Sequence, residues 1–167
     1  MTKIINNPKI TNDELVNVNR SAIEHRATWM GLTYMEGKKA GADAEKIARA
    51  AVAQTGGMHG AGFKAKMKTA GKIEEFAGVF LTPLGMKTFE MDVKTRNKDA
   101  LEIQFHYCPL VAAWLKAGIP KEEIPKLCDI AMDGDRNIAK AVGADFKLGK
   151  TIAAGDPICE VNFYKKK

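Results

Sequence analysis

The sequence contains few cysteines and few aromatic residues, and it has no long apolar run. Its three cysteines are odd in number, widely spaced and without a CxxC motif, which argues against a disulfide framework and gives no zinc spacing. No apolar stretch approaches the roughly 18 residues that a membrane span needs. The segment MTKIINNPKI lacks the apolar stretch of a signal peptide. We therefore expect a cytoplasmic protein without a membrane partner.

The charge balance is basic but dispersed. The 26 Lys and Arg residues outnumber the 20 Asp and Glu residues, which gives a formal net charge of +6 at pH 7. The only tight basic cluster is Lys165, Lys166 and Lys167, and the 7% of aromatic residues form no stripe with basic residues. This pattern argues against a nucleic-acid partner. A basic balance does suit an anionic small-molecule substrate, which it attracts at long range.

Helical periodicity dominates the first half of the chain. It predicts helices over 13–39, 43–54 and 63–80. Thr11 or Asn12 is expected to cap the first helix, Gly41 to end it, and Asp43 to open the second. An apolar stripe is expected to turn the first helix toward the core. Its members are Leu15, Val18, Ala22, Trp29 and Leu32.

The second half introduces strands. Apolar and polar residues alternate in KTFEMDVK and LEIQFHY, which predicts a hairpin, and a second hairpin is predicted to turn near Gly155 and Asp156. Between them, one helix is predicted from Pro109 to Gly118 and another over 120–142. The chain is thus predicted to be a single α+β domain over 1–167. A helical part (10–82) precedes a ββααββ part (83–167), whose small antiparallel sheet is covered by helices.

The glycine-rich stretch GGMHGAGFK matches neither a phosphate loop nor a dinucleotide-binding loop. Phe63 stands where a phosphate loop has lysine, and the stretch follows a helix instead of a strand. We interpret it as a flexible connection between two helices. Because glycines let a backbone approach a ligand closely, His59 within it is a candidate substrate-binding residue.

The acidic stretch AMDGDRN does not carry the further ligands of a calcium loop. Asp129, Asp133 and Arg136 are three to seven residues apart along the chain. Side chains at such helical spacings form intrahelical ion pairs, which explains these residues without a binding function.

Cys108 lies where a predicted strand meets a predicted helix. Pro109 suits the first position of that helix, so the thiol is expected near the positive helix end, which lowers a thiol pKa. His106 precedes Cys108 by two residues, and a Cys–His pair is one form of activated nucleophile. Cys128 and Cys159 suit buried core positions. A weaker alternative is a divalent metal ion held by His106, Cys108, Cys128 and Cys159.

Several blocks of the sequence resemble the L-2-amino-thiazoline-4-carboxylic acid hydrolase family. In the second half these blocks are YCPLV followed by Trp114, LCDIAM followed by GD, TIAAGD, and Cys159 before a short strand; AIEHRATWMGLTY and GADAEKIARAA are also similar. The positions that match are Cys108, Trp114, Cys128, Asp129, Asp135, Asp156 and Cys159. The resemblance implies a small-molecule hydrolase that opens a cyclic amidine-like ring, giving an N-carbamoyl cysteine. We expect no cofactor.

The resemblance also suggests roles, which are hypotheses for individual residues. Cys108, or a water it orients, would attack the ring carbon, and His106 or Asp156 would handle protons with Cys159 nearby. Arg26 or Lys150 would hold the substrate carboxylate, with His59 and Trp114 as further substrate contacts. A non-catalytic small-ligand-binding module and a thiol–metal protein remain alternatives. A homo-oligomer also remains open.

Overall fold

The computed structural model describes residues 3–166, and its helices and strands follow the predicted α+β order. The helices are α1 (Glu14–Lys39), α2 (Ala44–Lys66), α3 (Ile73–Phe80), α4 (Pro83–Phe89), α5 (Pro109–Lys116), α6 (Ile124–Ala131), α7 (Asp133–Val142) and the 3₁₀ turn η1 (Ile152–Ala154). The strands are β1 (Met91–Arg96), β2 (Ala100–Phe105), β3 (Ala144–Leu148) and β4 (Cys159–Lys165). The α+β prediction is therefore confirmed.

The four strands form one antiparallel sheet in the order β1-β2-β4-β3. Ile103 of β2 lies opposite Val161 of β4, and both side chains are buried. Residues on β4 alternate between buried and half-buried, because successive side chains point to opposite faces of a strand. As predicted, Cys159, Val161 and Phe163 share the buried face.

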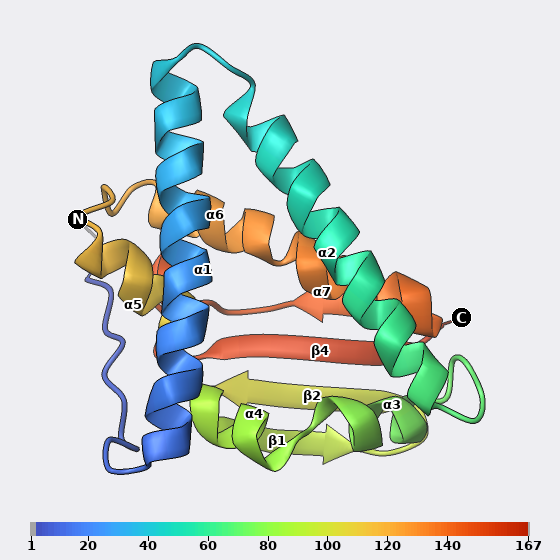
Figure 1. Cartoon of the computed structure of the whole chain (residues 1–167). Helices are drawn as coiled ribbons and strands as arrows, with labels where there is room; N and C mark the ends of the chain where they lie inside the picture. Colours follow the sequence, from blue (N-terminus) through green and yellow to red (C-terminus); the bar gives the residue numbers. More distant parts are fainter. Residues whose placement is uncertain (1–2, 167) are drawn as a thin grey trace.

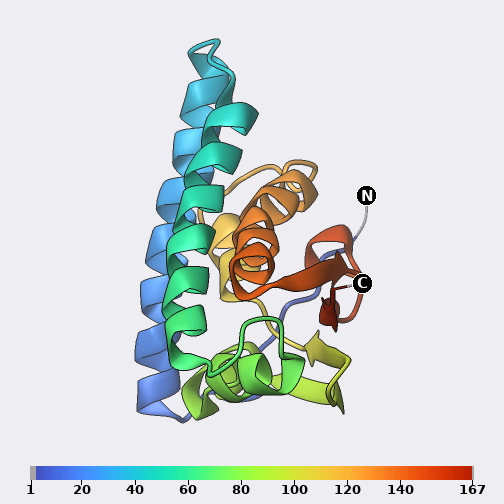
Figure 2. The same ribbon diagram turned by 90° about the vertical axis from the view of Figure 1, so that its right-hand side faces the viewer.

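The two long helices cover this face in a layer of their own (Figures 1 and 2). α1 and α2 meet at the turn that joins them and then diverge, α1 packing on α5 and α2 packing on α7. α3 and α4 lie beside β1 and β2, at the opposite end of the sheet from α6 and α7 (Figure 1). One buried apolar cluster, which includes Phe76, Trp114 and Phe163, draws on both halves of the chain.

The side of α1 that packs against the rest of the protein is not the side predicted from the sequence. Leu15, Val18, Trp29 and Leu32 are exposed, Trp29 to 67%. The buried residues are Val16, Arg20, Ile23, Ala27, Gly31 and Tyr34. A Cβ atom on Gly31 would lie 2.7 Å from Cδ1 of Trp114, so small residues let α1 approach this bulky side chain. The cap also differs, since Asp13 accepts the hydrogen bond from the Val16 amide.

The glycine-rich stretch is helical, so the prediction of a flexible connection after Gln54 is wrong. α2 continues to Lys66 because Gly56 and Gly60 lie where it touches α7. A Cβ atom on Gly56 would lie 2.3 Å from the carbonyl oxygen of Gly134, and one on Gly60 would lie 2.6 Å from Cβ of Ala141. Close helix packing therefore explains these glycines.

Three further boundaries differ from the predictions. Phe63 belongs to α2, and the chain turns before α3. Thr82 caps α4 with Pro83 in its first turn, so the alternating residues before Glu90 are helical. The predicted helix over 120–142 is divided at Met132 into α6 and α7.

Two expectations concern the molecular surface and the chain end. Within residues 3–166 there is no helix with the length and apolar character needed to cross a membrane. Of the three terminal lysines, Lys167 lies outside the described residues.

Candidate functional site

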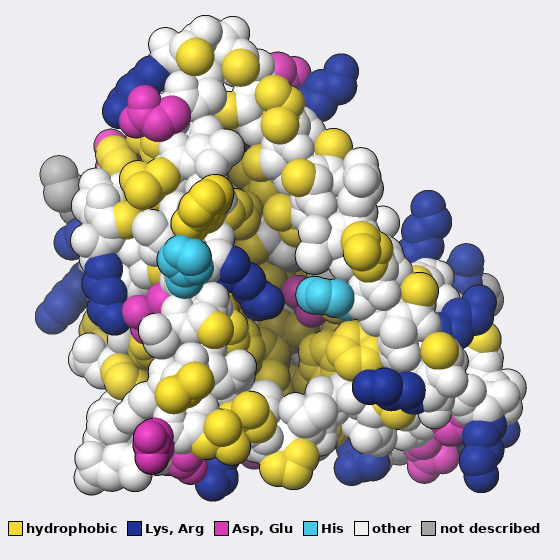
Figure 3. All heavy atoms as spheres, viewed as in Figure 1, with side chains coloured by type: hydrophobic (Ala, Val, Ile, Leu, Met, Phe, Trp, Pro, Cys, Tyr) yellow, Lys and Arg dark blue, Asp and Glu magenta, His cyan; other side chains and the backbone are white. Residues whose placement is uncertain are grey.

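A cavity of about 680 Å³ opens where α1 and α2 diverge. Figure 3 shows a hollow between the two helices, with mainly hydrophobic side chains inside and two histidines beside its opening. The polar groups that line the cavity come from separate elements: Arg26 and Thr33 from α1, Thr55 and His59 from α2, Asp135 from α7 and Thr151 directly before η1. The helix divergence thus creates a largely apolar site with few polar groups.

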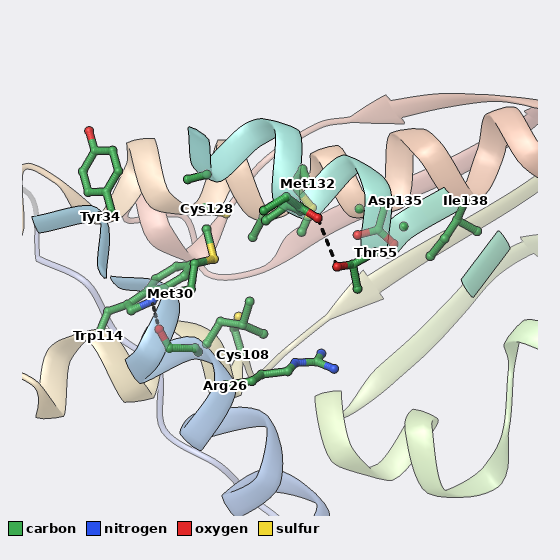
Figure 4. Close-up of a pocket in the computed structure, with 18 of the residues that line it drawn as sticks. Arg26, Met30, Tyr34, Thr55, Cys108, Trp114, Cys128, Met132, Asp135 and Ile138 are labelled. Atoms are coloured by element: carbon green, nitrogen blue, oxygen red, sulfur yellow. Dashed lines mark hydrogen bonds between the residues drawn. The ribbon is translucent and has the colours of Figure 1, made fainter. Parts of the chain in front are cut away.

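Arg26 and Asp135 are oppositely charged residues on facing elements of this cavity (Figure 4). Burial raises the pKa of Asp135 to about 6, although its own backbone amide, Arg26 and Arg136 oppose the shift. Neither Arg26 nor Asp135 takes part in an ion pair among the described residues. A carboxyl group with this pKa can exchange protons near neutral pH.

The neighbouring acids of α6 and α7 are engaged elsewhere. Arg49 of α2 donates to Asp129 at 2.6 Å and to Asp133 at 2.9 Å, and Arg136 pairs with both acids at 2.6 Å. Burial would raise the pKa of Asp129, but the two guanidinium groups outweigh it and hold the pKa below its usual value. The predicted intrahelical pair of Asp133 and Arg136 is confirmed within α7, whereas the Asp129–Arg136 pair joins α6 to α7. Arg49 extends both pairs to α2. Asp135 alone is left facing the cavity.

All three cysteines line the same cavity. Burial raises the pKa of each thiol, that of Cys159 to about 12. Cys108 and Cys159 also contribute to the raised pKa of Cys128, after burial. The sulfur of Cys159 also accepts the amide of Ile152 at 3.3 Å.

Cys108 does lie at the start of α5, directly before Pro109, as predicted. Its expected low pKa is wrong, because burial outweighs the Leu110 and Val111 amides, which act in the opposite direction. Its backbone is fixed by Asn6, whose side chain bonds to both the amide and the carbonyl of Cys108 at 2.8 Å. The position is therefore well defined, but its thiol is mostly protonated at neutral pH.

The other candidate residues divide into two groups. Arg26, His59 and Trp114 line the cavity, and the Trp114 indole donates to the Ala27 carbonyl at 2.9 Å. The described cavity lining does not include His106, Asp156 or Lys150. Asp156 instead accepts the Thr151 amide, and Lys150 lies 3.9 Å from Glu160. The proposed Cys108–His106 pair is thus not assembled around the cavity.

The alternative metal shell was predicted from His106, Cys108, Cys128 and Cys159. Within residues 3–166, no three His, Cys, Asp or Glu side chains are grouped so that they could hold a metal ion. The three cysteines share the cavity wall, but His106 does not join them there. The residues therefore do not fit this ligand set.

These features define an α+β protein with a ligand-sized cavity that holds one basic and one acidic side chain. The chain belongs to the L-2-amino-thiazoline-4-carboxylic acid hydrolase family, whose sequence model matches residues 20–163. The predicted resemblance is confirmed, and the family name indicates a small-molecule hydrolase. No curated protein and no solved structure matches the chain.

Sequence reasoning did not place Asp135 among the candidate site residues, although it lies in the cavity lining. It matches the family pattern, but the ion-pair interpretation of AMDGDRN gave it no role of its own. A signal was present: Asp129 and Asp133 stand seven and three residues before Arg136, whereas Asp135 is adjacent to it and cannot share its helix face. In the single helix predicted over 120–142, Asp135 also follows Cys128 by seven residues, a spacing that places two side chains on one helix face.

Proposed function

We propose that this protein hydrolyses a cyclic amidine-like C=N group in an anionic small molecule bound between α1 and α2. The observation that carries the proposal is the presence of Arg26 and Asp135, unpaired with other described residues, in one apolar cavity. An arginine can hold a carboxylate through two parallel hydrogen bonds. A carboxyl group with a raised pKa is a stronger base than an ordinary aspartate once it is ionised.

The reaction proposed for Asp135 is general-base catalysis. Its carboxylate takes a proton from a water molecule as the water oxygen bonds to the ring carbon between sulfur and nitrogen. That proton is passed to the ring nitrogen, the carbon–sulfur bond breaks, and the second water proton ends on sulfur. The products of this balanced addition are a carbamoyl group and a free thiol.

Cys108 is the second candidate nucleophile. It lines the same cavity at the start of α5, and its sulfur would attack the same ring carbon. The thiolate is the reactive form of cysteine, and the raised pKa of Cys108 makes that form scarce at neutral pH. A water molecule is therefore favoured over the thiol as the nucleophile.

The proposal is tested with 2-amino-thiazoline-4-carboxylate and the purified protein. The parent protein is expected to release thiol, and Arg26→Gln is expected to raise KM at least tenfold because the carboxylate loses its partner. Lys150→Gln, which alters a cation outside the cavity lining, is the matched control and should keep the parent KM. Absence of turnover in the parent would contradict the proposed reaction.

The same assay separates the two nucleophiles. Cys108→Ala should retain activity within about tenfold if water attacks, because the thiol then only fills space. Complete loss of activity in a folded Cys108→Ala protein, together with a covalent adduct in the parent detected by mass spectrometry, would assign the attack to Cys108 instead.

A further inference from the structure

The cavity is large for the compound that gives the family its name. That compound is one small ring with an amino group and a carboxylate, whereas about 680 Å³ is within the range of pockets for drug-sized ligands. Along α1 the lining runs from Arg26 to Gly37, a helix length of about 16 Å. A single ring would leave much of this length in contact with water.

The lining is also apolar on two sides. One part, between α1 and α2, includes Met30, Tyr34, Ala44, Ala48 and Ala51, with Thr33 as a polar neighbour. The other, over α3, α4 and the sheet, consists of Phe80, Phe89, Met91, Phe105 and Val161. Among the described lining residues, Arg26, His59 and Asp135 are the only ones of the Lys, Arg, His, Asp and Glu types. Burying an apolar ligand against such walls contributes favourable binding free energy, whereas a small polar ligand gains very little from them.

The rim of the cavity is also apolar. Trp29 and Ile47 line it although they are 67% and 58% exposed. Exposed large apolar side chains beside an apolar cavity mark a surface that a ligand can cover. The rim and the interior together suit a molecule with a substantial apolar body.

We infer that the substrate of this site is an anionic molecule with an extended alkyl or aromatic body, larger than 2-amino-thiazoline-4-carboxylate. The inference rests on the proposed function for the chemistry of the reacting head. In this arrangement Arg26 holds the anionic group, Asp135 faces the reacting ring, and the apolar walls hold the body.

Binding of simple probes tests this ligand class without any turnover. Hexanoate, decanoate and decanol are titrated into the protein by calorimetry. Each buried methylene contributes about fourfold in affinity, so decanoate should bind on the order of 100-fold more tightly than hexanoate. Arg26→Gln should weaken the binding of decanoate at least tenfold and leave the affinity for decanol unchanged.

Two alanines of α2 supply a matched pair of variants. Ala48 lines the cavity, whereas Ala50 lies on the same helix, is exposed and is not part of the described lining. Ala48→Phe should weaken the binding of decanoate at least tenfold, because the new side chain fills the cavity. Ala50→Phe should leave the affinity for decanoate unchanged. Affinity that is independent of chain length, or equal in these two variants, would overturn the inference.

The two proposals fail in different ways. Turnover of the small ring compound without chain-length-dependent binding would leave the hydrolase proposal standing and overturn the apolar substrate class. Strong binding of decanoate through Arg26, without turnover of any ring compound, would overturn the hydrolytic chemistry and leave an apolar-anion site.

Discussion

Helix α2 approaches α7 and α1 in different ways. On α7 its backbone comes so close that Gly56 and Gly60 have no space for a Cβ atom. With α1 it is close near the connecting turn, where a Cβ on Gly37 would lie 3.1 Å from Cβ of Ala44, and then it diverges. The cavity occupies the space left by this divergence. Tight packing on one side of α2 thus holds an open site on its other side.

The acidic residues at the α6–α7 junction are likewise divided between the helix contact and the cavity. Asp129 and Asp133 bind Arg49 and so stabilise the α2 contact, whereas Asp135 faces the cavity. One short segment therefore serves both packing and the proposed chemistry. Substitutions at Asp129 and Asp135 should therefore have separate effects on stability and on activity.

Replacing the cavity acid should abolish the activity without unfolding the protein. Asp135→Asn is expected to lower kcat at least 100-fold, the lower end of the usual contribution of a general base. Its thermal midpoint should not fall, because Asp135 takes part in no ion pair among the described residues. Asp129→Asn is the matched variant and should lower the midpoint while it keeps kcat. Equal kcat values in the two variants would refute this separation.

Adding one methyl group at the α2–α7 contact should destabilise the fold. Gly56→Ala is expected to lower the free energy of unfolding by about 1–3 kcal/mol, because the new Cβ meets the backbone of Gly134. The adjacent Gly57 has no atom within 4 Å of such a Cβ. Gly57→Ala should therefore stabilise the helix by up to about 1 kcal/mol. Chemical denaturation measures both, and similar changes would contradict the packing argument.

The pH dependence should report the buried carboxyl group. With a pKa of about 6, Asp135 is ionised above that pH and protonated below it. A base acts in its ionised form, so kcat/KM should fall as the pH decreases through 6, by about tenfold at pH 5. The profile should be flat from pH 7 to 8. An activity that instead keeps rising through alkaline pH would point to ionisation of Cys108, whose pKa is raised above its ordinary value.

The ion pairs around Arg49 should contribute the smallest effect. Its side chain is partly exposed, so Arg49→Met is expected to cost about 1 kcal/mol, less at high salt. Lys39→Met removes a solvent-exposed ion pair with Glu36 and should leave the thermal midpoint unchanged. Thermal melts at low and high salt compare the two. A salt-independent loss in Arg49→Met would indicate lost packing in place of lost ion pairs.

Local patterns in the sequence determined much of the fold. Asp43 capped α2 as predicted, and alternation identified β2 and the buried face of β4 correctly. It also identified the junction at Cys108 and Pro109. These features depend on neighbouring residues in the chain, and for that reason they can be predicted from the sequence.

Other features depend on residues that are distant in the sequence, and only the tertiary structure decided them. Periodicity correctly identified α1 as a helix, but the side that it predicted to face the core is exposed. The side that packs is determined by contact with Trp114. Glycines that suggested a loop were required for contact with α7. Burial, a property of the assembled cavity, reversed the low pKa expected for Cys108 and raised the pKa of Asp135. The sequence by itself determined the family, the general order of helices and strands, and most of the candidate side chains. Folding determined which of them share the site, because the free energy of a charge depends on the surroundings that distant segments build.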